Sequence, residues 1–159
     1  MKKENSVRLY NVMFPIWLLM LLPAIWLVIL PANFVVDSLV VLITLACLHY
    51  EGKKEVWKKS ILRVWIIGFV SDMIGSALIL GIYSLLVSVV DWEIHRPPLE
   101  QIITIPGIAL AGVLIYFLNR KLSFRKTSLD AAQIHKVSLA LAIATAPYTM
   151  MIPMSWIYY

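Results

Sequence analysis

Long apolar segments restrict the fold of this sequence more than any other feature. Five predominantly apolar runs cover residues 12–30, 34–50, 64–90, 102–118 and 137–157, with short polar segments between them. A helix that crosses a bilayer needs about 20 mainly apolar residues. The runs therefore predict an all-α polytopic membrane protein with five transmembrane helices, organised as a single membrane domain over residues 1–159.

The overall composition supports this interpretation. Apolar residues make up 61% of the chain and charged residues 14%, whereas a soluble domain has about 45–50% and about 25%. These values exclude a soluble globular protein, a disordered tail, a collagen and a nucleic-acid-binding module. The single cysteine, Cys47, excludes an intrachain disulfide.

Short breaks divide the runs. Pro31-Ala32-Asn33 is predicted to end the first helix, and Asn33 is a suitable N-cap for the second, so these two helices form a tight antiparallel hairpin. The apolar core of the first run is too long for a signal peptide, so we expect it to be retained as a helix. Ser128 or Asp130 is expected to cap the start of the fifth helix.

The distribution of basic residues predicts the topology. Thirteen of the 14 Lys and Arg residues precede the first run, or lie between the second and third or the fourth and fifth runs; Arg96 is the exception. Basic residues near helix ends are retained in the cytoplasm. We therefore expect a cytoplasmic N-terminus, an outer C-terminus and a multi-pass location in the bacterial plasma (inner) membrane.

Two of these groups, residues 53–63 and 120–136, are called the basic segments below. Each basic residue close to anionic lipid headgroups contributes about 1 kcal/mol to membrane binding. We expect these segments to contact such headgroups; docking of a cytosolic partner is the alternative. No nucleic-acid partner is expected.

Asp72 is the most informative single residue. It is expected near the midplane of the third helix, where a carboxylate costs about 2.5–3.5 kcal/mol and normally faces a partner or a wet cavity. Gly68 and Gly75 share its helix face, and Ser71 and Ser76 flank that face. Asp72 is therefore either a proton or cation site on a transport path or a structural acid bonded to another helix.

The fifth helix is interrupted by polar residues and a proline. Thr145, Tyr148 and Thr149 surround Pro147, which frees the carbonyl of Ile143 from its helical partner. This pattern indicates either a broken helix with backbone oxygens at a binding site or a kink satisfied by a threonine hydroxyl. With a second break expected at Pro106-Gly107, it favours a central polar cavity.

Small residues recur at the spacing used in helix packing. Gly107-x-x-x-Ala111 and Ala140-x-x-x-Ala144 are such pairs, and Gly68 and Gly75 add a small surface to the third helix. Small residues let membrane helices approach closely. We expect these positions to pack within the bundle or between protomers.

The sequence assigns no catalytic residue, metal site or cofactor. Asp37 is expected in the first turn of the second helix, where the helix dipole favours a carboxylate; the alternative is a second carboxylate that acts with Asp72 or Asp91. Its different depth from Asp72 argues against the paired carboxylates of an aspartyl protease. Cys47 and His49 point to opposite sides of their helix, so a metal site is not expected there. Phosphate-loop, nucleophile-elbow and zinc patterns are absent from the sequence.

Two functions follow from these patterns. The first is a small transporter or channel whose ion or substrate path is lined by polar residues of the third and fifth helices, namely Ser71, Asp72, Ser76, Thr145, Tyr148 and Thr149. The second is a non-catalytic membrane subunit that packs against a larger membrane partner. Partners expected in either case are the lipid bilayer and a homo-oligomer or a larger membrane protein; an enzyme is the less favoured class.

Overall fold

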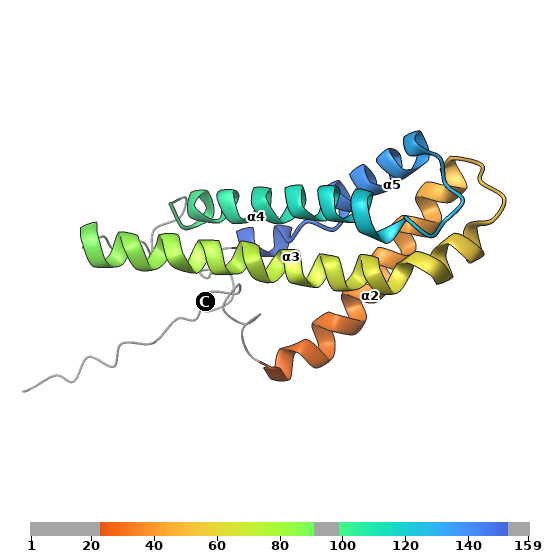
Figure 1. Cartoon of the computed structure of the whole chain (residues 1–159). Helices are drawn as coiled ribbons and strands as arrows, with labels where there is room; N and C mark the ends of the chain where they lie inside the picture. Colours follow the sequence, from red (N-terminus) through yellow and green to blue (C-terminus); the bar gives the residue numbers. More distant parts are fainter. Residues whose placement is uncertain (1–22, 91–98, 153–159) are drawn as a thin grey trace, which may run out of the picture.

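The computed structural model describes residues 23–90 and 99–152, and every regular element in these ranges is helical. In chain order the elements are α2 (Pro23–Cys47), α3 (Lys53–Val90), α4 (Leu99–Leu118), the π-helical turn η1 (Asn119–Ser123), α5 (Ala131–Ala144) and the 3-10 turn η2 (Tyr148–Met151). Figure 1 shows α3 and α4 side by side, with α2 and α5 packed near one end of them.

Three helical segments within the described ranges are long and apolar enough to cross a membrane. They are Leu27–Cys47, Lys53–Leu86 and Gln101–Ser123. Large apolar side chains on the outer faces are exposed, among them Leu27 at 80% and Phe117 at 59%. Lipid solvates such faces, whereas in water they would form a large exposed apolar patch that promotes aggregation. The protein is therefore an all-helical bundle with the outer surface of a membrane protein.

The predicted hairpin over the first two runs is wrong, because α2 continues through Pro31-Ala32-Asn33 without a break. A proline inside a helix removes one backbone donor, and in membrane proteins a neighbouring helix can bond the freed groups. Pro31 frees the carbonyl of Leu27. The indole Nε1 of Trp65 on α3 donates to the carbonyl of Leu30, the residue before Pro31, at 2.8 Å, and so ties α3 to α2 beside the proline. Residues 12–22 of the first predicted helix lie outside the described ranges.

The third and fourth helices are longer than their apolar runs. The first basic segment is helical and continuous with α3, which has 38 residues. The break predicted at Pro106-Gly107 is wrong, since both residues lie inside α4. Gly107 is buried against α3, and this contact supports the helix where Pro106 removes a hydrogen bond.

The fifth helix is shorter than predicted. Asp130 caps α5 as expected, with its side chain accepting from the backbone nitrogen of Gln133 at 2.7 Å. The helix ends at Ala144, and the segment 137–157 is therefore not one continuous spanning helix. Pro147 disfavours helical geometry in the residue before it, which explains the end of α5 near this point.

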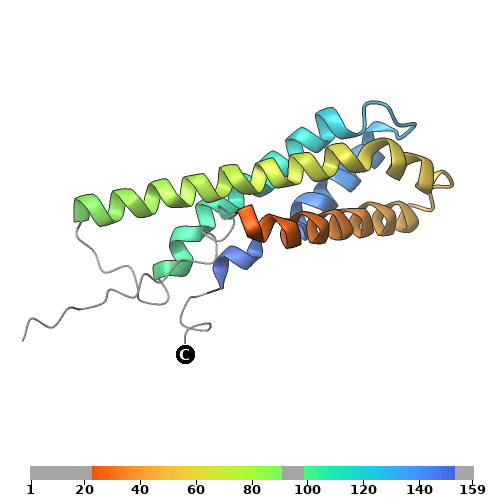
Figure 2. The same ribbon diagram turned by 90° about the horizontal axis from the view of Figure 1, so that it is seen from below.

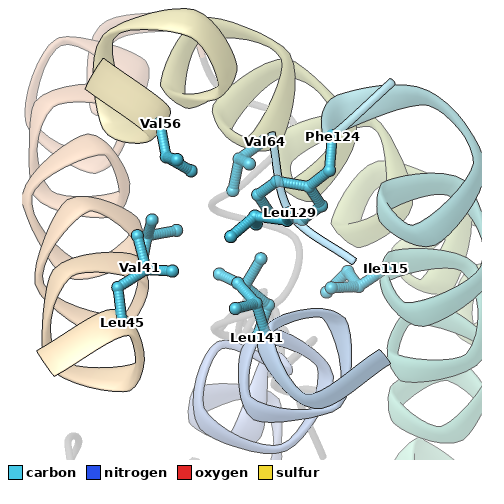
Figure 3. Packing of buried hydrophobic residues seen from close by; sticks show 9 residues of the cluster. Val41, Leu45, Val56, Val64, Ile115, Phe124, Leu129 and Leu141 are labelled. Carbon is cyan, nitrogen blue, oxygen red and sulfur yellow. The ribbon is translucent and has the colours of Figure 1, made fainter. Parts of the chain in front are cut away.

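Both basic segments lie at the same end of the bundle (Figures 1 and 2). A hydrogen bond between the hydroxyl groups of Tyr50 and Ser128, with 2.6 Å between the oxygens, joins the loop between α2 and α3 to the loop that precedes α5. Beneath them is the larger apolar cluster (Figure 3), which consists of Val41, Leu45, Val56, Val64, Ile115, Phe124, Leu129, Val137 and Leu141. This cluster holds α2, α3, α4 and α5 together at the basic end.

Candidate functional site

A cavity of about 250 Å³, with polar and apolar side chains in its wall, lies between α2, α3 and the chain that follows α5. Its walls are formed by Asn33, Val36 and Asp37 of α2, by Gly68 and Asp72 of α3, and by residues 144–149. A water molecule occupies about 30 Å³ in the liquid, so the cavity has room for about eight. Its size fits a small solute or a hydrated ion.

Two carboxyl groups face this cavity from neighbouring helices. Asp37 is 4% exposed and Asp72 is 6% exposed, and both line the same cavity. The prediction that they lie at different depths is wrong. Because α2 begins at Pro23, Asp37 lies midway along that helix, and Asp72 lies midway along α3.

Gly68 makes room for the pair, because it lies one turn before Asp72 on the same face of α3. A methyl group at this glycine would lie 3.4 Å from Oδ2 of Asp37. The absence of a side chain at Gly68 therefore leaves open the space in front of the Asp37 carboxyl group.

One oxygen of Asp72 is left without a bond. Oδ1 is buried and has no hydrogen-bond partner among the residues that the structure describes. Buried polar atoms are normally paired, and an unpaired one calls for an explanation. The described lining of the cavity also includes no Lys, Arg or His side chain to neutralise either carboxylate.

The break after α5 forms the third wall. The backbone nitrogen and the hydroxyl of Thr145 both donate to the carbonyl of Leu141, each at 2.8 Å. Pro147 deprives the carbonyl of Ile143 of its helical donor, and the hydroxyl of Tyr148 donates to it instead, at 2.8 Å. The chain is thus broken at the cavity, and two side chains satisfy the backbone there.

The structure brings four of the six predicted path residues to the cavity wall. Asp72, Thr145, Tyr148 and Thr149 all line the cavity. Ser71 and Ser76 are buried but donate to their own helix, to the carbonyls of Ile67 at 2.7 Å and Asp72 at 2.8 Å. Neither serine is part of the described cavity wall.

The predicted packing residues occupy three different settings. Gly75, Gly107 and Ala111 meet where α3 and α4 approach closely, and a methyl group at Gly75 would lie 2.6 Å from the Gly107 carbonyl oxygen. Gly68 and Ala144 line the cavity. Ala140 is partly exposed on α5.

The residues predicted for the path did not include Asp37, which was considered only as an alternative partner of Asp72, or Asn33. Their four-residue spacing places both on one face of a helix, but this signal appears only if α2 is continuous through Pro31. The described residues contain no group of three or more His, Cys, Asp or Glu side chains that could hold a metal ion. Comparisons with protein-family models, curated proteins and solved structures found no match to this chain.

Proposed function

We propose that this chain is a small transporter or channel in which a cation or proton passes through the cavity between α2, α3 and residues 144–149. The supporting observation is the pair of buried carboxyl groups, Asp37 and Asp72, on one cavity that has no basic residue in its described lining. The proposal includes five spans, a cytoplasmic N-terminus and a bacterial plasma membrane location.

The charge of the pair favours a mobile cation over a fixed structural bond. Each ionised carboxylate costs about 2.5–3.5 kcal/mol near the centre of a bilayer. Without a basic side chain beside them, the two acids must be neutralised by protons or by a bound cation. Either partner can leave the site, which is a requirement of a transport path.

The broken chain after α5 supports the same proposal. Helices that are interrupted near the bilayer midplane often line substrate and ion sites in transporters. Here the break places Thr145, Tyr148 and Thr149 opposite the two carboxyl groups. A wall with few helical hydrogen bonds can rearrange at a low cost in free energy, as alternating access requires.

The sequence around Asp72 disfavours the aspartyl-protease alternative. Two nearby carboxyl groups are one requirement of such an enzyme, but the residues before Asp72 are Phe-Val-Ser, which departs from the Gly-x-Gly-Asp motif of intramembrane proteases.

Asp72→Asn tests the proposal. Purified protein is reconstituted into vesicles that contain ion-sensitive dyes, and gradients of H⁺, Na⁺, K⁺ and Mg²⁺ are applied in turn. The wild-type protein is expected to carry at least one of these ions, and Asp72→Asn to reduce that flux to the level of protein-free vesicles. Glu51→Gln removes an exposed carboxylate at the basic end and is expected to leave the flux unchanged.

Equal flux in the Asp72→Asn and wild-type proteins would reject the transport proposal. In that case, copurification of a larger membrane protein with this chain would support the alternative of a non-catalytic subunit. Gel filtration and thermal melting of each variant show whether a loss of flux reflects misfolding.

A further inference from the structure

We infer that the groove between α4 and α5 binds one anionic phospholipid, with an acyl chain along the groove and the phosphate group at Arg120. Loose contact of the basic segments with many headgroups would need no such site. The inference adds an apolar groove of defined length with a cation at one end. It is independent of the proposed transport function.

The groove has a volume of about 570 Å³ and an apolar wall. On α4 this wall is a single stripe of side chains that recur every three or four residues from Ile105 to Phe117. Leu139 and Ile143 of α5 form the facing wall. The described wall contains no charged side chain, so its occupant must be apolar over most of its length.

Small residues on both sides keep the groove open. A methyl group at Gly112 would lie 3.7 Å from the carbonyl oxygen of Ala142 and 3.9 Å from Cβ of Ala146, so the chains are close together there. Beside this contact, the larger side chains of Val113 and Ile143 are 50% and 60% exposed. The small residues therefore form the floor and the large ones the sides, a shape that accepts a flexible hydrocarbon chain.

The length of the groove matches one leaflet of a bilayer. Ile105 and Phe117 are 12 positions apart on α4, which corresponds to about 18 Å along a helix axis. One leaflet contributes about 15 Å, half of the roughly 30 Å hydrocarbon core. One acyl chain can therefore extend along the whole groove.

The basic end of the groove carries a fixed cation. Tyr116 is part of the wall, and its hydroxyl accepts a hydrogen bond from Nη1 of Arg120 at 3.0 Å. The same hydroxyl lies 2.8 Å from Nδ1 of His135 on α5. The Arg120 guanidinium also lies 5.9 Å from the centroid of the Tyr116 ring. These contacts hold the guanidinium beside the groove.

The charge at this position favours a phosphate group. The Arg120 side chain is exposed and has no carboxylate partner among the described residues. A guanidinium has five N–H donors in a planar fork that matches phosphate oxygens, and the bond to Tyr116 uses one of them. A second copy of this chain in the same orientation would bring its own basic end to the same level, where like charges repel. An anionic lipid is therefore the occupant that complements the groove.

Photolabelling of the full-length protein in detergent tests this inference. The probe is a phosphatidylglycerol with a diazirine in one acyl chain. Unlabelled phosphatidylglycerol or phosphatidylcholine with the same acyl chains is added as a competitor. Mass spectrometry is expected to locate the label on groove residues of α4 and α5, and phosphatidylglycerol is expected to compete better than phosphatidylcholine.

One pair of variants tests the position of the acyl chain. Ala109 is an exposed residue of the groove wall, so Ala109→Phe fills the groove and is expected to abolish the labelling. Ala77→Phe makes the same change at an exposed position of α3 outside the described groove wall, and it is expected to leave the labelling unchanged.

A second pair tests the headgroup position. Arg120→Gln is expected to weaken the binding of phosphatidylglycerol about fivefold, the factor that corresponds to about 1 kcal/mol for one basic residue. Lys54→Gln removes one exposed charge from the first basic segment and is expected to have no effect. Because Arg120 is exposed, its variant keeps the test decisive even if Ala109→Phe does not fold.

Thermal melting and gel filtration monitor the folding and the oligomeric state of every variant. Equal competition by the two lipids, or binding that is unchanged in Arg120→Gln, overturns the inference in favour of unselective lipid contact. Labelling of the groove that persists in folded Ala109→Phe protein overturns it as well. Loss of self-association in Ala109→Phe without loss of lipid binding assigns the groove to a second copy of the chain and also overturns the lipid site.

Discussion

Buried polar side chains in this protein differ in where their hydrogen bonds go. Several side chains donate to a backbone carbonyl one turn earlier in the chain: Ser60 donates to the carbonyl of Val56 at 2.8 Å, and Asn119 donates to that of Ile115 at 2.9 Å. Such bonds satisfy the side chain without another helix. Oδ1 of Asp72 has no comparable bond in the described residues. The hydroxyls of Ser38 and Ser138 and the indole of Trp57 are likewise buried without a partner in the described residues. Asp72 differs from them in carrying a carboxyl group, whose charged form is the costliest to bury.

Gly75→Ala is predicted to destabilise the bundle. The added methyl group would lie 2.6 Å from the Gly107 carbonyl oxygen and 3.1 Å from Cβ of Ala111, so α3 and α4 must move apart. Overpacking of this kind costs about 1–3 kcal/mol, measurable as a lower free energy of unfolding in SDS titrations of the detergent-solubilised protein.

Gly81→Ala is the matched control, because a methyl group there meets nothing within 4 Å. It is expected to stabilise α3 or leave it unchanged, since alanine is favoured over glycine in helices by about 0.5–1 kcal/mol. Equal effects of the two substitutions would contradict the close approach at Gly75.

Prolines have opposite effects on different helices. Pro31 and Pro106 lie inside continuous helices, whereas α5 ends three residues before Pro147. The first two have a neighbouring contact close by, from the Trp65 indole and from the α3 surface at Gly107. After α5, Ala146 and Met150 pack into a cluster with Ile79 and Ile108, which favours a non-helical course. Tertiary contacts therefore decide which proline breaks its helix.

Asp130→Ala is predicted to weaken α5 by about 1 kcal/mol, the usual cost of losing an N-cap. The substitution removes the bond from the Gln133 nitrogen and with it one half of the capping box. Asp130→Asn keeps an acceptor and is expected to change the stability little. The free energy of unfolding of the two variants in SDS titrations is the measurement, and equal losses would contradict the capping role.

At the scale of the whole molecule, the basic segments lie together at one end of the bundle. The hydrogen bond between Tyr50 and Ser128 joins the loops next to these segments. Arg63 Nη1 of the first segment donates to the carbonyl of Leu122 in the second, at 3.5 Å. With 38 residues, α3 extends about 57 Å, well beyond the roughly 30 Å hydrocarbon core. Both ends of α3 are thus expected to reach an aqueous or headgroup region.

Cysteine labelling checks this arrangement in cells. In a Cys47→Ala background, Glu51→Cys and Lys121→Cys are expected to react with an impermeant maleimide only after the membrane is permeabilised. Ser88→Cys, near the opposite end of α3, is expected to react in intact cells. Reaction of only one of positions 51 and 121 in intact cells would contradict the common location of the basic segments.

The sequence by itself determined the helical class and the apolar outer surface, and it singled out Asp72, Thr145, Tyr148 and Thr149, which the structure brings to one cavity. These properties follow from local hydrophobicity and from the cost of a charge in lipid, both of which can be read residue by residue. The continuity of α2 through Pro31 and of α4 through Pro106 was decided only by the tertiary structure. The contacts beside these two prolines, from the Trp65 indole to Leu30 and from the α3 surface to Gly107, come from another helix that is distant in sequence. The pairing of Asp37 with Asp72 depends on the continuity of α2, and so the cavity between them emerges only when α2, α3 and the end of α5 pack together.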